Sequence, residues 1–118
     1  KNNVPAKALK SRWIEKFTEF KNLLERNYVQ TRNSKVYASE LNISYKLLNE
    51  ITKSLRGKTP KAFIDDFVTT EIKRYLASTS YTVKEISYIT GFDEPANMSK
   101  FFKKNALLSP LQFRTSNN

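Results

Sequence analysis

The amino-acid sequence predicts an all-α protein of about seven helices, in which two helix-turn-helix subdomains are joined by a long central helix. Apolar side chains recur every three or four residues along most of the 118-residue chain, which is the period of a helix with one buried face. Only 2 glycines and 4 prolines are present, so the chain has little of the turn material that a β-sheet needs. A third observation is an internal repeat of two helices separated by a tight turn, which favours the helix-turn-helix arrangement.

Composition and charge restrict the function of the chain. Its lack of cysteine and histidine excludes disulfides, Cys- or His-ligated metals and Ser-His-Asp catalysis, and we expect neither a metal nor any other cofactor. The 21 Lys and Arg outnumber the 11 Asp and Glu, for a net charge of +10, which favours a polyanionic partner such as nucleic acid. No apolar run reaches membrane-spanning length, so we expect no membrane contact and a location in the cytoplasm.

Apolar stripes locate the first helices of the chain. Residues 1–10 are expected to form a tether. A helix over residues 10–28 then has one apolar face, formed by Trp13, Phe17, Phe20, Leu24 and Tyr28. Ser34 is expected to cap the short helix that follows.

Two longer helices are expected next. Ser44 is a suitable N-cap for a helix that ends at Gly57, because a glycine readily adopts the left-handed conformation after a helix. Thr59 and Pro60 then open a helix that extends to about residue 78, which would make it roughly 28 Å long.

Three shorter helices are expected in the second half of the chain. Thr82 and Glu85 form a capping-box pattern that opens a helix ending near Gly91. Pro95 marks the first turn of the next helix, and the last helix opens with Ser109, Pro110 and Gln112. These elements predict a first helix-turn-helix subdomain with its N-terminal helix at 11–58, a linker helix at 59–79 and a second helix-turn-helix subdomain at 80–118.

The internal repeat relates the two halves of the chain. Residues 37–43 align with residues 86–92 at an offset of 49, and residues 48–53 align with residues 98–103 at an offset of 50. Each unit consists of a short helix, a tight turn and a second helix with a basic polar face. Two units are too few for a solenoid, so a pair of helix-turn-helix motifs is the better interpretation.

The polar faces of the two second helices carry side chains that can read DNA bases. Helical spacing groups them as Lys46, Asn49, Glu50 and Lys53 in the first unit, and as Ala96, Ser99, Lys100 and Lys103 in the second. Asn can pair with adenine, Lys can donate to guanine and Glu can accept from the cytosine amino group. The alternative is a pair of ordinary solvated faces, on which Lys46 and Lys53 pair with Glu50.

The distribution of charge favours DNA over this alternative. Residues 34–58 carry a net charge of +3 and residues 80–118 a net charge of +2, whereas residues 59–79 are neutral. A connecting helix of roughly 28 Å would set the two second helices about one turn of DNA apart, which is ~34 Å. One chain would then read two successive major grooves.

Several stretches of the chain resemble the AraC/XylS family of bacterial transcription regulators. The resemblance covers about residues 17–114 and is most specific in the second half, where it depends on Gly91-Phe92, Phe101-Phe102-Lys103-Lys104, Ser109-Pro110 and Phe113-Arg114. It implies a DNA-binding domain of two helix-turn-helix units joined by a long helix. Such a domain is usually the C-terminal part of a longer regulator, whose N-terminal domain senses an effector or mediates dimerisation.

The resemblance also implies which residues contact bases. It places base-reading positions at Lys46, Asn49 and Glu50 in the first unit, and at Pro95, Ala96, Ser99 and Lys100 in the second. Basic side chains at the ends of the second helices are expected to bind DNA phosphates, namely Lys53, Arg56, Lys58, Lys103 and Lys104. Leu107 departs from the family pattern, which usually has a glycine there.

We therefore expect sequence-specific binding of double-stranded DNA by a bacterial transcription regulator that acts as an activator or a repressor. The expected partners are DNA, RNA polymerase and an N-terminal effector or dimerisation domain outside this chain, and the expected location is the cytoplasm, at the nucleoid. The alternative function is an all-α basic module that binds proteins or RNA. We do not expect an enzyme, because the remaining carboxylates are more simply explained as the solvated side of a helix.

Overall fold

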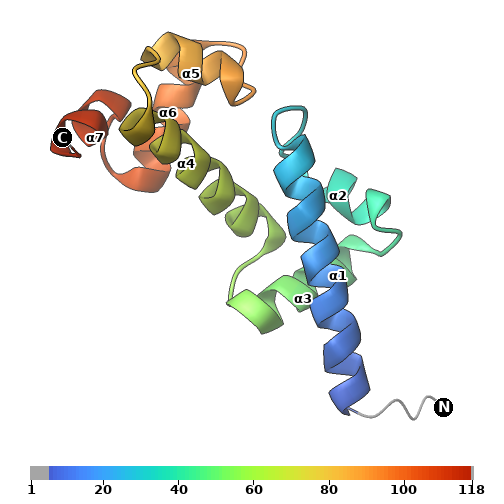
Figure 1. Ribbon diagram of the computed structural model, residues 1–118. Coiled ribbons are helices and arrows are strands. Elements are labelled where there is room, and N and C mark those ends of the chain that lie inside the picture. The colour runs from blue at the N-terminus through green and yellow to red at the C-terminus, as the bar shows by residue number, and fades with distance from the viewer. Residues whose placement is uncertain (1–5, 118) are drawn as a thin grey trace. The chain divides into compact units, whose positions relative to one another are not determined.

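The computed structural model describes residues 6–117, which form helices and the turns between them. The helices are α1 (Ala6–Asn27), α2 (Ser34–Glu40), α3 (Tyr45–Arg56), α4 (Pro60–Ser78), α5 (Val83–Ile89), α6 (Pro95–Ala106) and α7 (Pro110–Ser116), as Figure 1 shows. The part of the chain that is described contains seven helices and no strand, which confirms the predicted all-α class. None of these helices is both long enough and apolar enough to span a membrane.

The chain divides into two compact units whose boundaries differ from those expected. Unit 1 contains the chain up to Asn27 together with Asn33–Phe63, and unit 2 contains Tyr28–Arg32 together with the chain from Ile64 onward. The expected linker helix is therefore not a separate body, because α4 starts in unit 1 and belongs to unit 2 from Ile64. The turn after α1 also belongs to unit 2 rather than to the first subdomain.

The helix boundaries differ from the expected ones at two places in unit 1. Residues 6–10 are helical rather than part of a tether, and the remainder of the expected tether, residues 1–5, lies outside the described residues. Helix α2 is capped by Asn33, whose side chain accepts a hydrogen bond from the amide of Lys35, and not by Ser34. Asn33 has the extended backbone conformation of an N-cap, whereas Ser34 is already helical.

Unit 1 has a core of aromatic and aliphatic side chains from three mutually packed helices. Phe17, Phe20 and Leu24 of α1 are buried, and α2 and α3 both lie against α1 (Figure 1). The Phe20 ring packs edge-on against Tyr37 of α2 with a centroid distance of 5.8 Å, and Phe17 packs against Phe63 at 5.2 Å. Such aromatic pairs contribute about 0.5–1.5 kcal/mol each beyond the area they bury.

Unit 2 has a core that centres on one face of α4. Four residues on this face are buried: Ile64, Val68, Ile72 and Leu76. Ile86 of α5 and Met98 and Phe102 of α6 are also fully buried in this unit. Helix α7 is tied to the end of α4 because the Arg114 guanidinium donates to the carbonyl oxygens of Leu76 at 3.0 Å and Thr79 at 3.2 Å.

Two buried tyrosines belong to these cores. Burial raises the pKa of the Tyr37 phenol to about 12, and burial together with the Glu71 carboxylate raises the pKa of Tyr28 to about 12. The Tyr28 ring lies edge-on to Phe67, with the centroids 5.5 Å apart. Both phenols are therefore neutral near pH 7 and serve as core side chains.

The second helices of the two units end in the same way. Gly57 after α3 has a φ of 69°, and Leu107 after α6 has a φ of 66°. Each donates its amide to the carbonyl oxygen four residues earlier, at Lys53 and Lys103 respectively, over 2.9 Å. The repeat offset of 50 makes Gly57 and Leu107 equivalent positions. Leu107 therefore adopts the left-handed conformation that a glycine adopts in the first unit, and this conformation costs a residue with a Cβ atom roughly 1–2 kcal/mol.

Exchange of these two residues tests the strain at Leu107. The Leu107 side chain is 82% exposed, so Leu107→Gly loses little packing and is expected to raise the free energy of unfolding by about 0.5–1 kcal/mol. The matched variant Gly57→Leu should lower it by about 1 kcal/mol, because it introduces the strain that Leu107→Gly removes. Urea unfolding followed by circular dichroism measures both values. A destabilising Leu107→Gly would show that the Leu107 side chain makes compensating contacts.

Candidate nucleic-acid interface

Helix α3 separates a buried face from a charged one. The Ser44 hydroxyl accepts a hydrogen bond from the Leu47 amide and so fixes the start of the helix, as the sequence predicts. Leu48, Ile51 and Thr52 are buried, whereas the side chains on the opposite face are exposed; these are Lys46, Glu50 and Lys53. Because the helix cannot rotate without exposing its apolar side, its charged face is held outward.

The charged side chains of α3 are not neutralised by one another. Within residues 6–117, Glu50 forms no ion pair with Lys46 or Lys53, so the alternative interpretation of a self-paired face is not supported. Lys53 and Arg56 lie in the last turn of α3, and the exposed Lys58 follows it. The Arg56 guanidinium lies 4.7 Å from the Phe17 ring centroid, so a cation–π contact holds this side chain in place.

Asn49 occupies a different position from the one expected. It is half-buried at the margin of the exposed face, beside the buried Thr52, whose hydroxyl donates to the Asn49 carbonyl oxygen at 3.3 Å. The Asn49 Oδ1 atom is buried and has no hydrogen-bond partner among the described residues. An unpaired buried acceptor costs roughly 1–3 kcal/mol, so this amide gains from any ligand that provides a donor.

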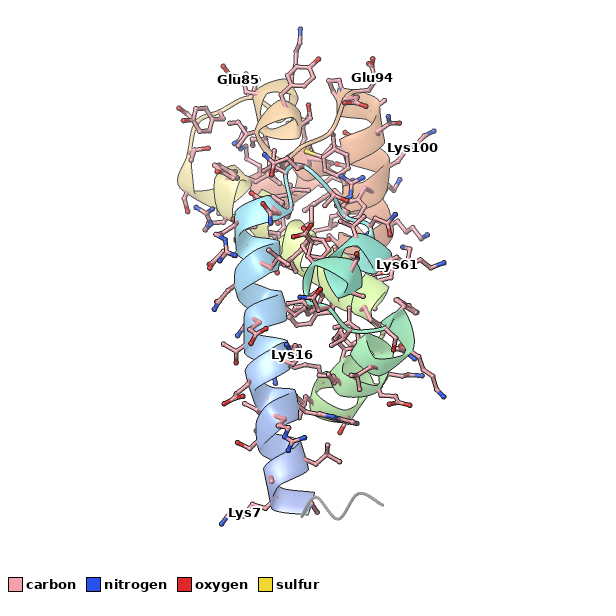
Figure 2. The ribbon with its side chains drawn as sticks, turned by 90° about the vertical axis from the view of Figure 1, so that its right-hand side faces the viewer. Lys7, Lys16, Lys61, Glu85, Glu94 and Lys100 are labelled. Carbon is pink, nitrogen blue, oxygen red and sulfur yellow. The ribbon has the colours of Figure 1, made fainter. Side chains whose placement is uncertain are left out.

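Helix α6 presents a basic face of a different composition. Ala96, Lys100, Lys103 and Lys104 are exposed, and Lys100 projects away from the helix in Figure 2. Pro95 and Ser99 are half-buried. At the predicted base-reading positions, α6 thus offers small side chains and one cation, whereas α3 offers Lys46, Asn49 and Glu50.

Two basic side chains of α4, Lys73 and Arg74, contact groups within unit 2 instead. Arg74 donates to the Glu71 carboxylate at 2.6 Å, which raises the pKa of the guanidinium, and the Lys73 ammonium lies 5.6 Å from the Phe113 ring centroid. The exposed cations of α3 and α6 have no such carboxylate partner among the described residues, and the same holds for Lys10 and Arg12 of α1. In the described part of the chain, no cluster of three His, Cys, Asp or Glu residues could hold a metal ion.

The turn of the second helix-turn-helix is held by the segment that follows α1. The Arg32 guanidinium lies over the Phe92 ring at 4.2 Å from its centroid and 5.6 Å from that of Phe101. Gly91, with a φ of 94°, approaches the Val29 backbone so closely that an added Cβ atom would lie 3.0 Å from the Val29 Cα atom and closer still to its carbonyl oxygen. Sequence reasoning missed the contact between Arg32 and Phe92, because no local pattern pairs a cation with an aromatic ring so far along the chain.

Two units, each with a short helix, a turn and an outward-facing basic second helix, define a double helix-turn-helix protein. A family model described as "Helix-turn-helix domain" matches residues 37–116. The chain belongs to this family, in its AraC type, the DNA-binding domains of AraC/XylS transcription regulators. The resemblance seen in the sequence is thereby confirmed.

Known proteins similar to this chain are transcription regulators. The chain is 26% identical over 91 residues to the uncharacterized HTH-type transcriptional regulator YisR of Bacillus subtilis (strain 168), a match that covers 77% of this chain and 32% of that protein. It therefore spans about a third of the length of this relative.

Two solved structures share the fold. An AraC-type transcriptional regulator from Chromobacterium violaceum matches with a TM-score of 0.77 and 20% identity, over 91% of this chain and 96% of that one. The DNA-binding domain of AdpA, a global transcriptional factor solved in complex with a target DNA, matches with a TM-score of 0.73 and 19% identity, over 84% of this chain and 89% of that one.

Substitution of Gly91 by alanine tests how much the close approach of Gly91 to the Val29 backbone contributes to stability. Gly91→Ala is expected to lower the free energy of unfolding by more than about 2 kcal/mol, because backbone strain and a steric clash add together. Gly57→Ala is the matched control, since Gly57 has a similar positive φ but no atom within 4 Å of an added Cβ, and it should cost only about 1 kcal/mol. Thermal unfolding measures both values. If the two variants lose the same free energy of unfolding, the close approach between Gly91 and Val29 does not contribute to stability.

Proposed function

We propose that this chain binds double-stranded DNA in a sequence-specific manner, with α3 and α6 as its two recognition helices. The observation that supports the proposal best is the pair of outward-facing polar helices, which are equivalent in the repeat and each carry exposed basic side chains. The structure of AdpA with a target DNA supports the same interaction for this chain. Each recognition helix would enter a major groove with its N-terminal turns toward the base edges.

In unit 1, we propose that Lys46, Asn49 and Glu50 read bases. Lys46 would donate to guanine and Glu50 would accept from the amino group of cytosine. Asn49 would pair with adenine, where the adenine amino group supplies the donor that the buried Oδ1 atom lacks. A small rotation of the Asn49 side chain toward the groove is required for this contact.

In unit 2, we propose that base reading depends on Pro95, Ala96, Ser99 and Lys100. Ala96 is exposed and suits apolar contact with a thymine methyl group, whereas Lys100 suits a guanine. Unit 2 would therefore use fewer hydrogen bonds than unit 1 to select its site.

Phosphate contacts are proposed for the basic side chains at and after the ends of α3 and α6. These are Lys53, Arg56, Lys58, Lys103 and Lys104. The cation–π contact with Phe17 already restricts the Arg56 side chain before DNA binds. A phosphate contact by Arg56 therefore costs less side-chain entropy than a phosphate contact by a mobile lysine.

We propose that the two units occupy successive major grooves through α4. The 19 residues of α4 span roughly 28 Å, close to the ~34 Å of one DNA turn. We further propose that the chain is the C-terminal part of a regulator in the bacterial cytoplasm. An N-terminal effector or dimerisation domain and RNA polymerase would determine whether the bound protein activates or represses.

Selection on random-sequence duplex DNA near physiological salt tests the proposal. We expect enrichment of two short motifs about 10 base pairs apart. A single motif would restrict base reading to one unit. No enrichment, with binding that disappears as salt rises, would contradict sequence-specific recognition, and a preference for single-stranded RNA would favour the alternative module.

Two substitutions separate base reading from general affinity. Asn49→Ala and Lys100→Ala should each weaken binding to the selected site by about 1–3 kcal/mol and binding to random DNA much less. Lys21→Ala on α1 is the control, because Lys21 is exposed and lies outside both recognition helices. Fluorescence anisotropy on both DNAs measures the difference. Equal losses on the two DNAs would remove these residues from base reading.

The phosphate contacts are tested by the dependence of affinity on salt. Lys53→Ala and Lys103→Ala should each reduce the slope of log K against log salt by about 1, with sequence preference unchanged. An unaltered slope would show that these lysines do not neutralise phosphates.

A further inference from the structure

The apolar stripe of α1 extends beyond the core of unit 1. Phe20 is fully buried and Phe17 is 4% exposed, but Trp13, one turn earlier on the same face, is only half-buried. Leu9, a further turn toward the N-terminus, is 42% exposed. The helix period continues without interruption, so the first turns of α1 present an apolar face without the cover that the core gives to Phe17 and Phe20.

Two hollows between α1 and α3 lie along this stripe and share Leu9 and Trp13. The first has a volume of about 350 Å³ and is lined by Arg12 and Lys16 and by the apolar side chains of Leu9, Trp13, Ile43, Leu47 and Ile51. The second has a volume of about 430 Å³ and includes Ala6, Lys10, Ser54 and Leu55. We call the two together the α1–α3 groove. Each volume falls within the range of roughly 300–1,000 Å³ that is usual for ligand-binding clefts.

The charge of the α1–α3 groove has one sign. Its charged lining residues are the cations Lys10, Arg12 and Lys16, and no carboxylate lines either hollow. Lys16, labelled in Figure 2, also pairs with Glu19 at 3.1 Å. Among residues 6–117, neither Lys10 nor Arg12 has an ion-pair partner. An occupant with carboxylates beside its apolar side chains would complement both features of the groove.

We propose that the α1–α3 groove binds an acidic amphipathic helix of a separate protein. Apolar residues of that helix at positions i, i+3 or i+4, and i+7 would enter the two hollows, and carboxylates beside them would meet Lys10 and Arg12. DNA is a poor occupant, because most of the lining is apolar.

A second copy of this chain and the residues directly before α1 complement the groove less well. A second copy of the chain has a net charge of +10, so the basic groove would repel it. Residues 1–5, which directly precede α1 in the sequence, include Lys1 and no carboxylate. Neither a second copy of this chain nor residues 1–5 therefore supplies the carboxylates that the groove complements.

The single tryptophan of the chain is a direct probe of the groove. Trp13 is the only tryptophan, so its emission reports on this site alone. The ligand in the test is a tryptophan-free synthetic helix with leucines at i, i+3 and i+7 and glutamates at the other positions. We expect a saturable blue shift of the Trp13 emission and an affinity that decreases with salt. The same peptide with lysines in place of glutamates should bind at least about tenfold more weakly.

Matched variants on α1 locate the contact. Leu9→Gln should weaken binding of the acidic peptide about fivefold or more, because Leu9 lines both hollows. Ile14→Gln is the control, since Ile14 is 47% exposed on the same helix but does not line the groove, and it should bind normally. Circular dichroism and DNA affinity should be the same for both variants and the wild type, which separates a lost contact from a lost fold.

Several results would overturn the proposal. These are an absent blue shift with the acidic peptide, equal affinity for the acidic and basic peptides, and equal affinities of the Leu9→Gln and Ile14→Gln variants. A shift of the Trp13 emission with anionic lipid vesicles but not with the peptide would assign the groove to a membrane surface instead. Failure of the DNA-binding proposal leaves these outcomes unchanged, because none of them requires DNA.

Discussion

The contact between the Val29 backbone and Gly91 is the constraint on which the organisation of the chain depends. It fixes Tyr28–Arg32 within unit 2, although the chain before and after this segment belongs to unit 1. The chain therefore passes between the units at Asn27, again at Arg32 and a third time within α4. Because unit 2 is assembled from two separate segments, its turn between α5 and α6 packs against a segment from much earlier in the chain. Arg32 reinforces this arrangement through two aromatic rings of unit 2.

The second helices of the two units share the same buried positions but differ in their outward-facing side chains. Both second helices bury a leucine-like residue at the same repeat position, Leu48 in α3 and Met98 in α6, and both end in a left-handed residue. Their outward faces differ, since α3 offers an amide and charges of both signs where α6 offers small side chains and a lysine. The common core explains why the repeat is visible in the sequence, and the outward faces explain why it is weak: burial restricts the inner residues, whereas solvent leaves the outer ones free to change.

Much of the fold could be predicted from the sequence because its determinants are local. The 3.6-residue period located the helices, and side-chain caps such as Ser44, Thr82 and Ser109 fixed several starts, all of which the structure confirms. Contacts between distant residues could not be predicted. Arg32 meets Phe92 across 60 positions of sequence, and no local pattern indicates this pairing. Asn49 lies beside Thr52 at the edge of its face because packing, and not the period alone, decides how far a marginal residue is buried.

If α3 and α6 are the two recognition helices, as proposed, their unlike faces would give the protein a direction on DNA. A symmetric dimer of identical reading heads binds a palindrome and looks the same from either end of its site. A single chain that reads DNA with two different helices would require an asymmetric site, and it would bind that site in one orientation only. Any surface elsewhere on the chain then points consistently upstream or downstream along the DNA. Inversion of the site would turn that surface the other way without any loss of affinity.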